Sequence, residues 1–192
     1  MHRFRGTCRK KLIGLIALLA VAFAVGSPAR AQVSLYAEAS ANSMNNGPYA
    51  DFLYSGTTGV VIGLGEFWHD RVVLSGDVQG NFGFNNSHPS FPTFASNETY
   101  NAVTLGPRIG LKPQFFKLAP YIQGNIGFAR YHDPITHSST DAVFGGQAGV
   151  ARQLTPRFDA VVDYSYSYFA YNSGYYHPQT FGIGIAYHFA RR

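Results

Sequence analysis

Histidines with serines beside them are the first candidates for chemistry in this 192-residue chain. His88 has serines at positions 87 and 90, and His137 is followed directly by two more. An imidazole that takes the proton of a neighbouring hydroxyl makes serine a nucleophile, provided that an acid orients the ring. His88, His137 and His177 lie in Asn-, Ser- and Pro-rich stretches typical of loops, whereas His188 lies in an alternating apolar stretch. We therefore expect solvated loop or polar interior histidines and no catalytic residue.

Metal and cofactor sites are also weakly indicated. His132, Asp133, His137 and Asp141 are the one cluster of possible metal ligands, and no second cluster at a fixed spacing completes a site. The glycine-rich run from Gly59 to Gly65 lacks the strand, turn and helix context of a phosphate-binding loop. We expect no metal and no cofactor.

A third group consists of polar side chains that interrupt apolar segments at alternate positions. Because successive residues of a strand point to opposite faces, the members of this group share one face. They are expected to form a polar network in a narrow interior, centred on one arginine. The network either gates a narrow path or satisfies buried polar groups, and we favour the second interpretation because a buried ion pair needs no further purpose. Its members are Glu38, Asp77, Gln79, Arg108, Gln123, Asn125, Gln147 and Asp163.

The elements that position these side chains are eight segments of 10 to 14 residues, close to the roughly 9 to 11 that a tilted strand needs to cross a membrane. The connections between them alternate between long polar stretches and shorter turns, as in an antiparallel up-and-down barrel of the outer membrane. The segments are Gln32–Ala41, Gly56–Trp68, Arg71–Phe84, Glu98–Leu111, Leu118–Tyr131, Ala142–Gln153, Phe158–Tyr171 and Pro178–Phe189. The second loses its alternation near Glu66, which predicts a bulge or a strand end there.

The alternation is clearest in the last segment, Thr180 to Phe189. Bulky apolar residues occupy its odd-numbered positions, and small or polar residues occupy the positions between them. A face of this kind is expected to contact lipid, while glycine and polar groups face a crowded interior. The apolar members are Phe181, Ile183, Ile185, Tyr187 and Phe189.

Charges and aromatic residues follow the same scheme. Arg130 and Arg152 have outward parity but lie near strand ends, where the cost of facing lipid is small. Aromatic side chains collect near the segment ends and are interpreted as girdles at the two membrane interfaces. The main girdle candidates are Phe67, Trp68, Phe158, Tyr168 and Tyr171.

Residues 1–31 are expected to form a secretory signal peptide, which leaves residues 32–192 as one barrel domain. A basic start precedes the apolar run Leu12 to Val25, which at about fourteen residues is shorter than the roughly 20 of a spanning helix. Six of the 15 Lys and Arg residues lie in this leader and none of the 10 Asp and Glu residues does, so the mature net charge is about −1. The basic charge of the whole chain is therefore no argument for nucleic-acid binding, and the mature chain, without Cys8, has no disulfide.

In these features the chain resembles the small eight-stranded outer-membrane barrels of the OmpA transmembrane-domain and OmpX type. The resemblance covers the mature chain and is sharpest in the last segment, whose pattern ending in Phe189 is similar to the signal that the barrel assembly machinery reads. In that family the aromatic residue is usually the last, whereas three residues follow it here. The resemblance implies a localisation in the outer membrane, with the loops extracellular and both termini periplasmic. It implies outer-membrane lipid, lipopolysaccharide and the assembly machinery as partners.

Two classes of function remain open. The first is a non-enzymatic barrel with a side-chain-filled interior that supports the envelope or presents its loops to a partner. The second is a lipid A-modifying enzyme of deacylase or acyltransferase type, as found among eight-stranded barrels. The sequence lacks the His-x-Ser-Asn strand motif of the deacylases, so we expect the first class. A soluble barrel of lipocalin type would require the inverse arrangement, with apolar residues inside.

Overall fold

A computed structural model describes residues 32–46, 49–67, 71–85, 98–113, 115–133, 137–171 and 174–189. The expected signal peptide, Trp68 and the polar connection of residues 86–97 lie outside the described residues. No helix in the described ranges is long and apolar enough to cross a bilayer.

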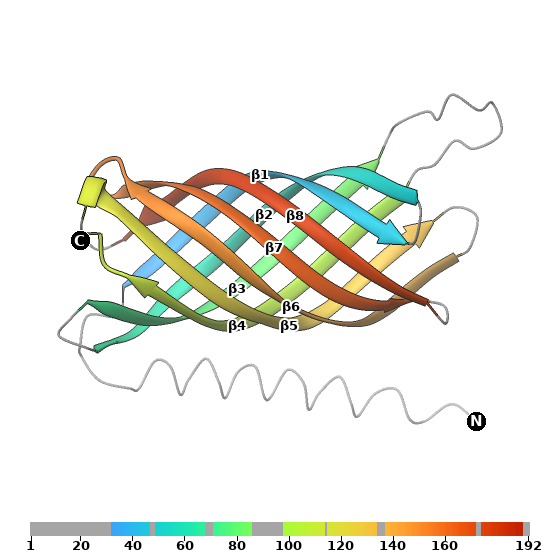
Figure 1. Ribbon diagram of the computed structural model, residues 1–192, viewed down its shortest axis with the longest axis horizontal. Helices are drawn as coiled ribbons and strands as arrows, with labels where there is room; N and C mark the ends of the chain where they lie inside the picture. The colour runs from blue at the N-terminus through green and yellow to red at the C-terminus, as the bar shows by residue number, and fades with distance from the viewer. Residues whose placement is uncertain are drawn as a thin grey trace. The chain divides into compact units, whose positions relative to one another are not determined.

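The described chain forms a closed barrel in which each strand pairs antiparallel with its sequence neighbours and the first pairs with the last (Figure 1). This confirms the predicted eight-stranded up-and-down barrel. A short 3-10 helix, η1 (Phe115–Lys117), precedes β5. The strands are β1 (Val33–Asn46), β2 (Tyr49–Phe67), β3 (Val72–Asn85), β4 (Glu98–Leu111), β5 (Leu118–Asp133), β6 (His137–Gln153), β7 (Phe158–Tyr171) and β8 (Gly174–His188).

Several strands are longer than predicted. The polar stretch between residues 42 and 55 was expected to be a loop, but β1 and β2 stay paired to Asn46 and Tyr49. Apolar residues alternate only where a strand crosses the hydrocarbon layer. Backbone pairing between strands continues beyond this layer, where the sequence no longer alternates. Near Glu66 the β2–β3 register shifts between Gly63 and Gly65, which agrees with the predicted bulge.

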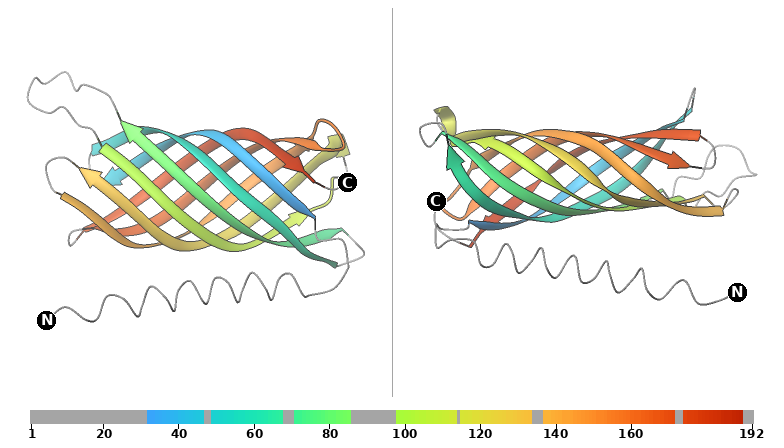
Figure 2. Two further views of the ribbon diagram at one scale, coloured as in Figure 1. Left: turned by 180° about the vertical axis from the view of Figure 1, so that it is seen from behind. Right: turned by 90° about the horizontal axis from the view of Figure 1, so that it is seen from below.

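The two ends of the barrel differ in their connections. The turn end is the end of the barrel that carries Val33, His188 and the β2–β3, β4–β5 and β6–β7 connections. The opposite end is the loop end. The strands run at a slant to the long axis when seen from behind and from below (Figure 2). Ser34 of β1 lies opposite His188 of β8, so the β1–β8 pair, here called the seam, brings both ends of the described chain together.

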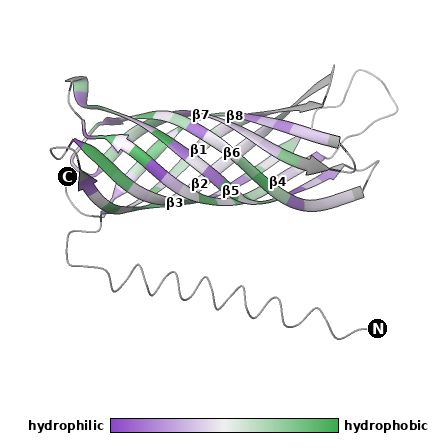
Figure 3. Cartoon of the chain, turned by 60° about the horizontal axis from the view of Figure 1, so that its bottom comes forward, coloured by the Kyte–Doolittle hydropathy of each residue, from purple (hydrophilic) through white to green (hydrophobic). Residues whose placement is uncertain are grey.

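Most large side chains on the outside of the barrel are apolar. Phe181, Ile183 and Ile185 are 55%, 59% and 54% exposed, and outward residues of the other strands are similar. Hydrophobic and hydrophilic residues alternate along the strands (Figure 3). This is the orientation expected of a sheet in contact with lipid, and it is the inverse of a soluble ligand-binding barrel.

The interior is layered, a feature that the sequence analysis did not predict. An apolar cluster towards the loop end includes Ala129, Tyr131 and Phe169, and another towards the turn end includes Tyr121 and Ala151. On β5 and β6 the buried polar residues Gln123, Asn125 and Gln147 fall between the members of these two clusters. The polar side chains therefore lie between two apolar layers.

Candidate functional site in the barrel interior

Arg108 and Asp77 form the centre of the polar layer. The Arg108 Nη1 and Asp77 Oδ2 atoms are 3.5 Å apart, and the two side chains are only 15% and 1% exposed. The pair arises from the β3–β4 register, in which Arg108 lies opposite Ser75, two residues from Asp77 and on the same face. The Tyr36 hydroxyl donates to Asp77 Oδ1 at 3.1 Å and is 2.9 Å from Gln79 Oε1.

Tyr121 joins this centre to the opposite wall. The Arg108 guanidinium carbon lies 3.3 Å from the centroid of the Tyr121 ring, which is a cation–π contact. The Tyr121 hydroxyl donates to Asp163 Oδ2 at 2.9 Å, and Gln147 Nε2 donates to the same oxygen at 2.8 Å. Asn125 Nδ2 lies 3.4 Å from Gln147 Oε1.

Gln123 and Glu38 complete the layer. Gln123 Nε2 donates to Asn125 Oδ1 at 2.6 Å. Glu38 is 7% exposed, and its carboxylate lies beside that of Asp163: a Cβ atom on Gly182 would come within 2.9 Å of Glu38 Oε2 and 3.0 Å of Asp163 Oδ1. The structure thus brings the eight polar residues singled out in the sequence into one interior layer that spans strands β1 and β3 to β7. Such an arrangement fills and orders an interior.

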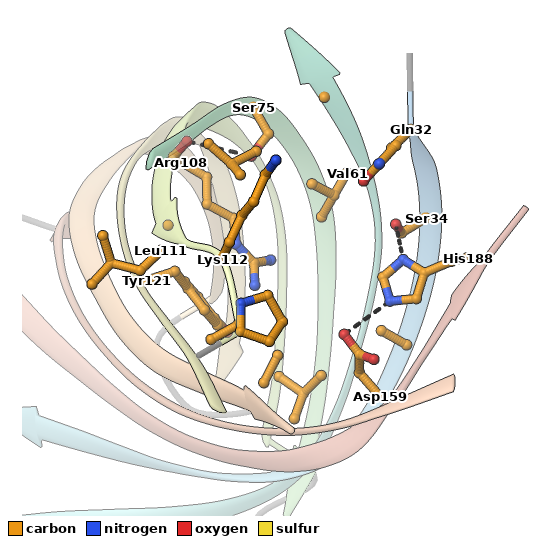
Figure 4. A pocket seen from close by; sticks show the side chains of 18 of the residues that line it. Gln32, Ser34, Val61, Ser75, Arg108, Leu111, Lys112, Tyr121, Asp159 and His188 are labelled. Atoms are coloured by element: carbon orange, nitrogen blue, oxygen red, sulfur yellow. Dashed lines mark hydrogen bonds and ion pairs between the residues drawn. The ribbon is translucent and has the colours of Figure 1, made fainter. Parts of the chain in front are cut away.

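A pocket of about 370 Å³ lies between this layer and the turn end (Figure 4). Arg108 and Tyr121 line it together with small apolar residues such as Ala151. The side chains of Lys112 and Glu66, which also line it, form a half-exposed ion pair. The pocket therefore combines an apolar wall with a few polar groups, the usual composition of small-molecule sites.

One wall of this pocket carries a chain of three polar side chains. Ser34 Oγ lies 2.6 Å from His188 Nδ1, and His188 Nε2 lies 2.9 Å from Asp159 Oδ2. The three residues come from β1, β8 and β7 and are 6%, 4% and 1% exposed. Figure 4 shows the three side chains in line, with both contacts drawn.

Sequence reasoning missed this set. It placed His188 in the interior, but it paired neither Ser34 nor Asp159 with it. Ser34 and His188 are 154 positions apart, so no local spacing reveals them. The signal that could have found them is the seam itself, because aligning the first and last strands at the turn end places the two residues opposite each other.

The residues of the expected assembly signal lie on β8 and just after it. Phe181, Ile183 and Ile185 face outward, and the Tyr187 ring packs between those of Phe158 and Phe189 with centroid distances of 5.1 and 5.2 Å. These contacts form an aromatic group at the turn end.

At the loop end, the girdle candidate Tyr168 contacts the rings of Phe144 and Tyr175, each at 4.9 Å. Phe67 and Tyr171 lie within β2 and β7, but their side chains, like all of Trp68, are outside the described residues.

Among the residues considered as metal ligands, Asp133 and His137 are direct backbone partners across the β5–β6 pair. His132 is exposed, and the His177 ring accepts from or donates to the Tyr166 hydroxyl at 2.9 Å. His88 and the side chains of Asp133 and His137 fall outside the described residues. Within the part of the chain that the structure describes, no group of three or more His, Cys, Asp or Glu side chains is placed to hold a metal ion.

Comparison with known proteins agrees with the fold. The family model for the outer membrane protein beta-barrel domain matches residues 15–189. A comparison with curated proteins found no match.

Among solved structures, Neisserial surface protein A is similar with a TM-score of 0.65 and 14% identity, over 81% of this chain and 96% of that one. Ail, the attachment invasion locus protein of Yersinia pestis, is similar with a TM-score of 0.53 and 17% identity, over 83% of this chain and 99% of that one. At these identities the likeness concerns the fold.

Proposed function

Since this chain belongs to the outer membrane protein beta-barrel domain family, we propose that it is an integral outer-membrane barrel with a structural role in the envelope, or one in surface interaction through its loop-end connections. Membership of the family shows that it is an outer-membrane β-barrel protein. The proposal adds that the interior polar layer serves to fill the barrel and that the role does not depend on modification of lipid A.

The observation that carries this proposal is the contrast between the two faces of the sheet. The outward residues Val103, Ile122 and Ile183 are 60%, 62% and 59% exposed, whereas Asp77 and Asp163 are almost fully buried in the interior. Exposing so many contiguous apolar side chains to water is unfavourable, so the surface requires lipid. Outer-membrane lipid and lipopolysaccharide are therefore the proposed surroundings, and the barrel assembly machinery is the proposed partner in biogenesis.

The distribution of charge supports a proposal for the orientation of the barrel. The turn end carries Arg71, Lys112, Lys117 and Arg157, whereas the sequence between the strands at the loop end contains no Lys or Arg. We propose that the turn end and both termini are periplasmic. Trypsin, which cuts after Lys and Arg, should then leave the protein whole on intact cells, because its sites are on the far side of the membrane or within paired strands.

Chymotrypsin is the matched reagent for this prediction, because it cuts after aromatic residues and Phe94 lies in the connection between β3 and β4. Intact cells treated with chymotrypsin should yield a fragment that ends at Phe94, as mass spectrometry can establish. Trypsin fragments that end at Lys117 or Arg157 from intact cells would mean that the turn end is extracellular.

The proposed absence of lipid A modification gives a separate prediction. A deacylase would need its nucleophile on the lipid-facing wall, but Ser34 and His188 point into the barrel. Lipid A from cells with and without the protein should therefore carry identical acyl chains by mass spectrometry. A lost or added acyl chain that depends on the protein would contradict the structural role proposed above.

A further inference from the structure

We propose that Ser34 is a nucleophile that attacks short-chain esters in the turn-end pocket, with His188 as its base and Asp159 as the residue that orients the imidazole. This activity goes beyond the structural role and is directed at small molecules on the turn side, away from the lipid surface.

The two contacts of His188 define its role. Asp159 Oδ2 lies 2.9 Å from Nε2 as an ion-pair contact without hydrogen-bond geometry, and the nearby carboxylate favours the tautomer that carries its proton on Nε2. Nδ1 then has a free lone pair and faces the Ser34 hydroxyl at 2.6 Å, within the range of a hydrogen bond donated by serine. Nucleophile, base and orienting acid are therefore in the order that activation of serine requires.

The sheet holds this set rigidly. Ser34 and His188 are direct partners across the seam, and the β7–β8 register places Asp159 opposite Ala186, two residues from His188 on the same face. The His188 backbone amide also donates to the Arg157 carbonyl at 2.8 Å. Side chains fixed by strand pairing keep their geometry better than side chains on loops, which suits a reactive site.

The pocket determines the class of substrate. Its volume of about 370 Å³ is at the small end of the range for small-molecule sites. The wall near Ser34 contains Val61, Val161 and Ala186, which suit a short apolar acyl chain. We infer a carboxylic ester with a short apolar acyl group.

The reaction balances without any co-reactant except water. Ser34 Oγ would bond to the ester carbonyl carbon while His188 Nδ1 takes the hydroxyl proton. The bond from that carbon to the alcohol oxygen then breaks, and the departing alkoxide receives the proton from His188. Water, with His188 again as base, hydrolyses the acyl-serine to the free acid and restores Ser34.

Oxyanion stabilisation in this site depends on side chains. Backbone N–H groups of paired strands are used in the sheet, so donors must come from side chains that line the pocket, namely Gln32, Arg108 and Lys112. Arg108 and Lys112 also take part in ion pairs. Because an oxyanion donor contributes about 10²–10³-fold to turnover, we expect slow hydrolysis, and covalent labelling of Ser34 is the more sensitive measurement.

The test uses the folded full barrel in detergent and a fluorophosphonate probe, which reacts with activated serines. Mass spectrometry should find the adduct on Ser34. Ser34→Ala should abolish the labelling, and His188→Gln should slow it by about 100-fold or more, the usual contribution of a general base. Asp159→Asn should slow it as well, because the ring loses its preferred tautomer.

Ser55 provides the matched control. It is a buried serine of the barrel interior outside this pocket, and its hydroxyl lies 2.8 Å from that of Ser40. Ser55→Ala should be labelled like the original protein. Folding of every variant is checked by the gel shift between heated and unheated samples, so that loss of labelling is interpreted only for closed barrels.

Each labelling result either supports or overturns the proposal. An adduct on Ser34 that depends on His188 supports the proposal. No adduct on Ser34, labelling that survives in folded Ser34→Ala, or equal labelling in folded His188→Gln overturns it and leaves the three side chains as a structural link between β1, β8 and β7. None of these results affects the proposed structural role, which the protease and lipid A experiments test separately.

Discussion

Replacing Arg108 by leucine is expected to lower the free energy of unfolding by about 3–5 kcal/mol, the usual cost of removing one partner of a buried ion pair. Asp77 is 1% exposed and, without its cation, would have to remain buried as an unpaired charge or take up a proton, and either costs free energy. The Tyr121 ring would also lose the guanidinium that lies 3.3 Å from its centroid. Urea unfolding of the barrel in lipid vesicles, followed by tryptophan fluorescence or the gel shift, measures the change.

Two further variants identify the cause of this effect. Combining Arg108→Leu with Asp77→Asn should recover most of the lost stability, because the unpaired charge disappears together with the arginine. Arg152→Leu removes an exposed arginine near the end of β6 and should change stability by no more than about 0.5 kcal/mol. Equal losses for Arg108→Leu and Arg152→Leu would show that the polar layer contributes nothing specific.

Replacing Gly106 by alanine is expected to prevent normal pairing of β4 with β5. A Cβ atom at this position would overlap the carbonyl oxygen of Gly124 in the backbone of the neighbouring strand. A backbone group held in a sheet cannot move aside as the end of a flexible side chain can. We expect a loss of stability at or above the roughly 1–3 kcal/mol typical of overpacking, measured as a lower urea midpoint and a smaller folded fraction.

Gly124→Ala is the control for this prediction. It adds the same methyl group to the same strand pair, but a Cβ atom on Gly124 would meet no other atom within 4 Å. It should therefore fold normally. If Gly106→Ala and Gly124→Ala behave alike, the close approach of the two strands at Gly106 is not a constraint on the fold.

The barrel itself was predictable because its signal repeats in every strand. The alternation between Phe181 and Phe189 already predicts which side of β8 faces outward. Strand ends were less predictable, since Asn46 and Tyr49 are backbone partners in a stretch whose sequence resembles a loop. Beyond the hydrocarbon, no apolar period distinguishes a strand from a turn.

The site was predictable only as far as the face of each strand. Parity alone places Asp77, Arg108 and Asp163 in the interior. The contacts between them depend on the barrel register. This register places Tyr121 between Arg108 and Asp163, where it contacts both side chains. For the same reason Ser34 and Asp159 went unnoticed beside His188, because their proximity requires the first and last strands to be aligned.

The seam also has a consequence for how the protein folds. Each of the other strand pairs joins neighbours along the chain, so it closes a short stretch and loses little chain entropy. The β1–β8 pair joins residues 154 positions apart and raises the contact order of the whole barrel. Cylinder closure is thus the slow step built into this topology, and until it happens two unpaired strand edges stay available to a chaperone or a membrane-embedded template.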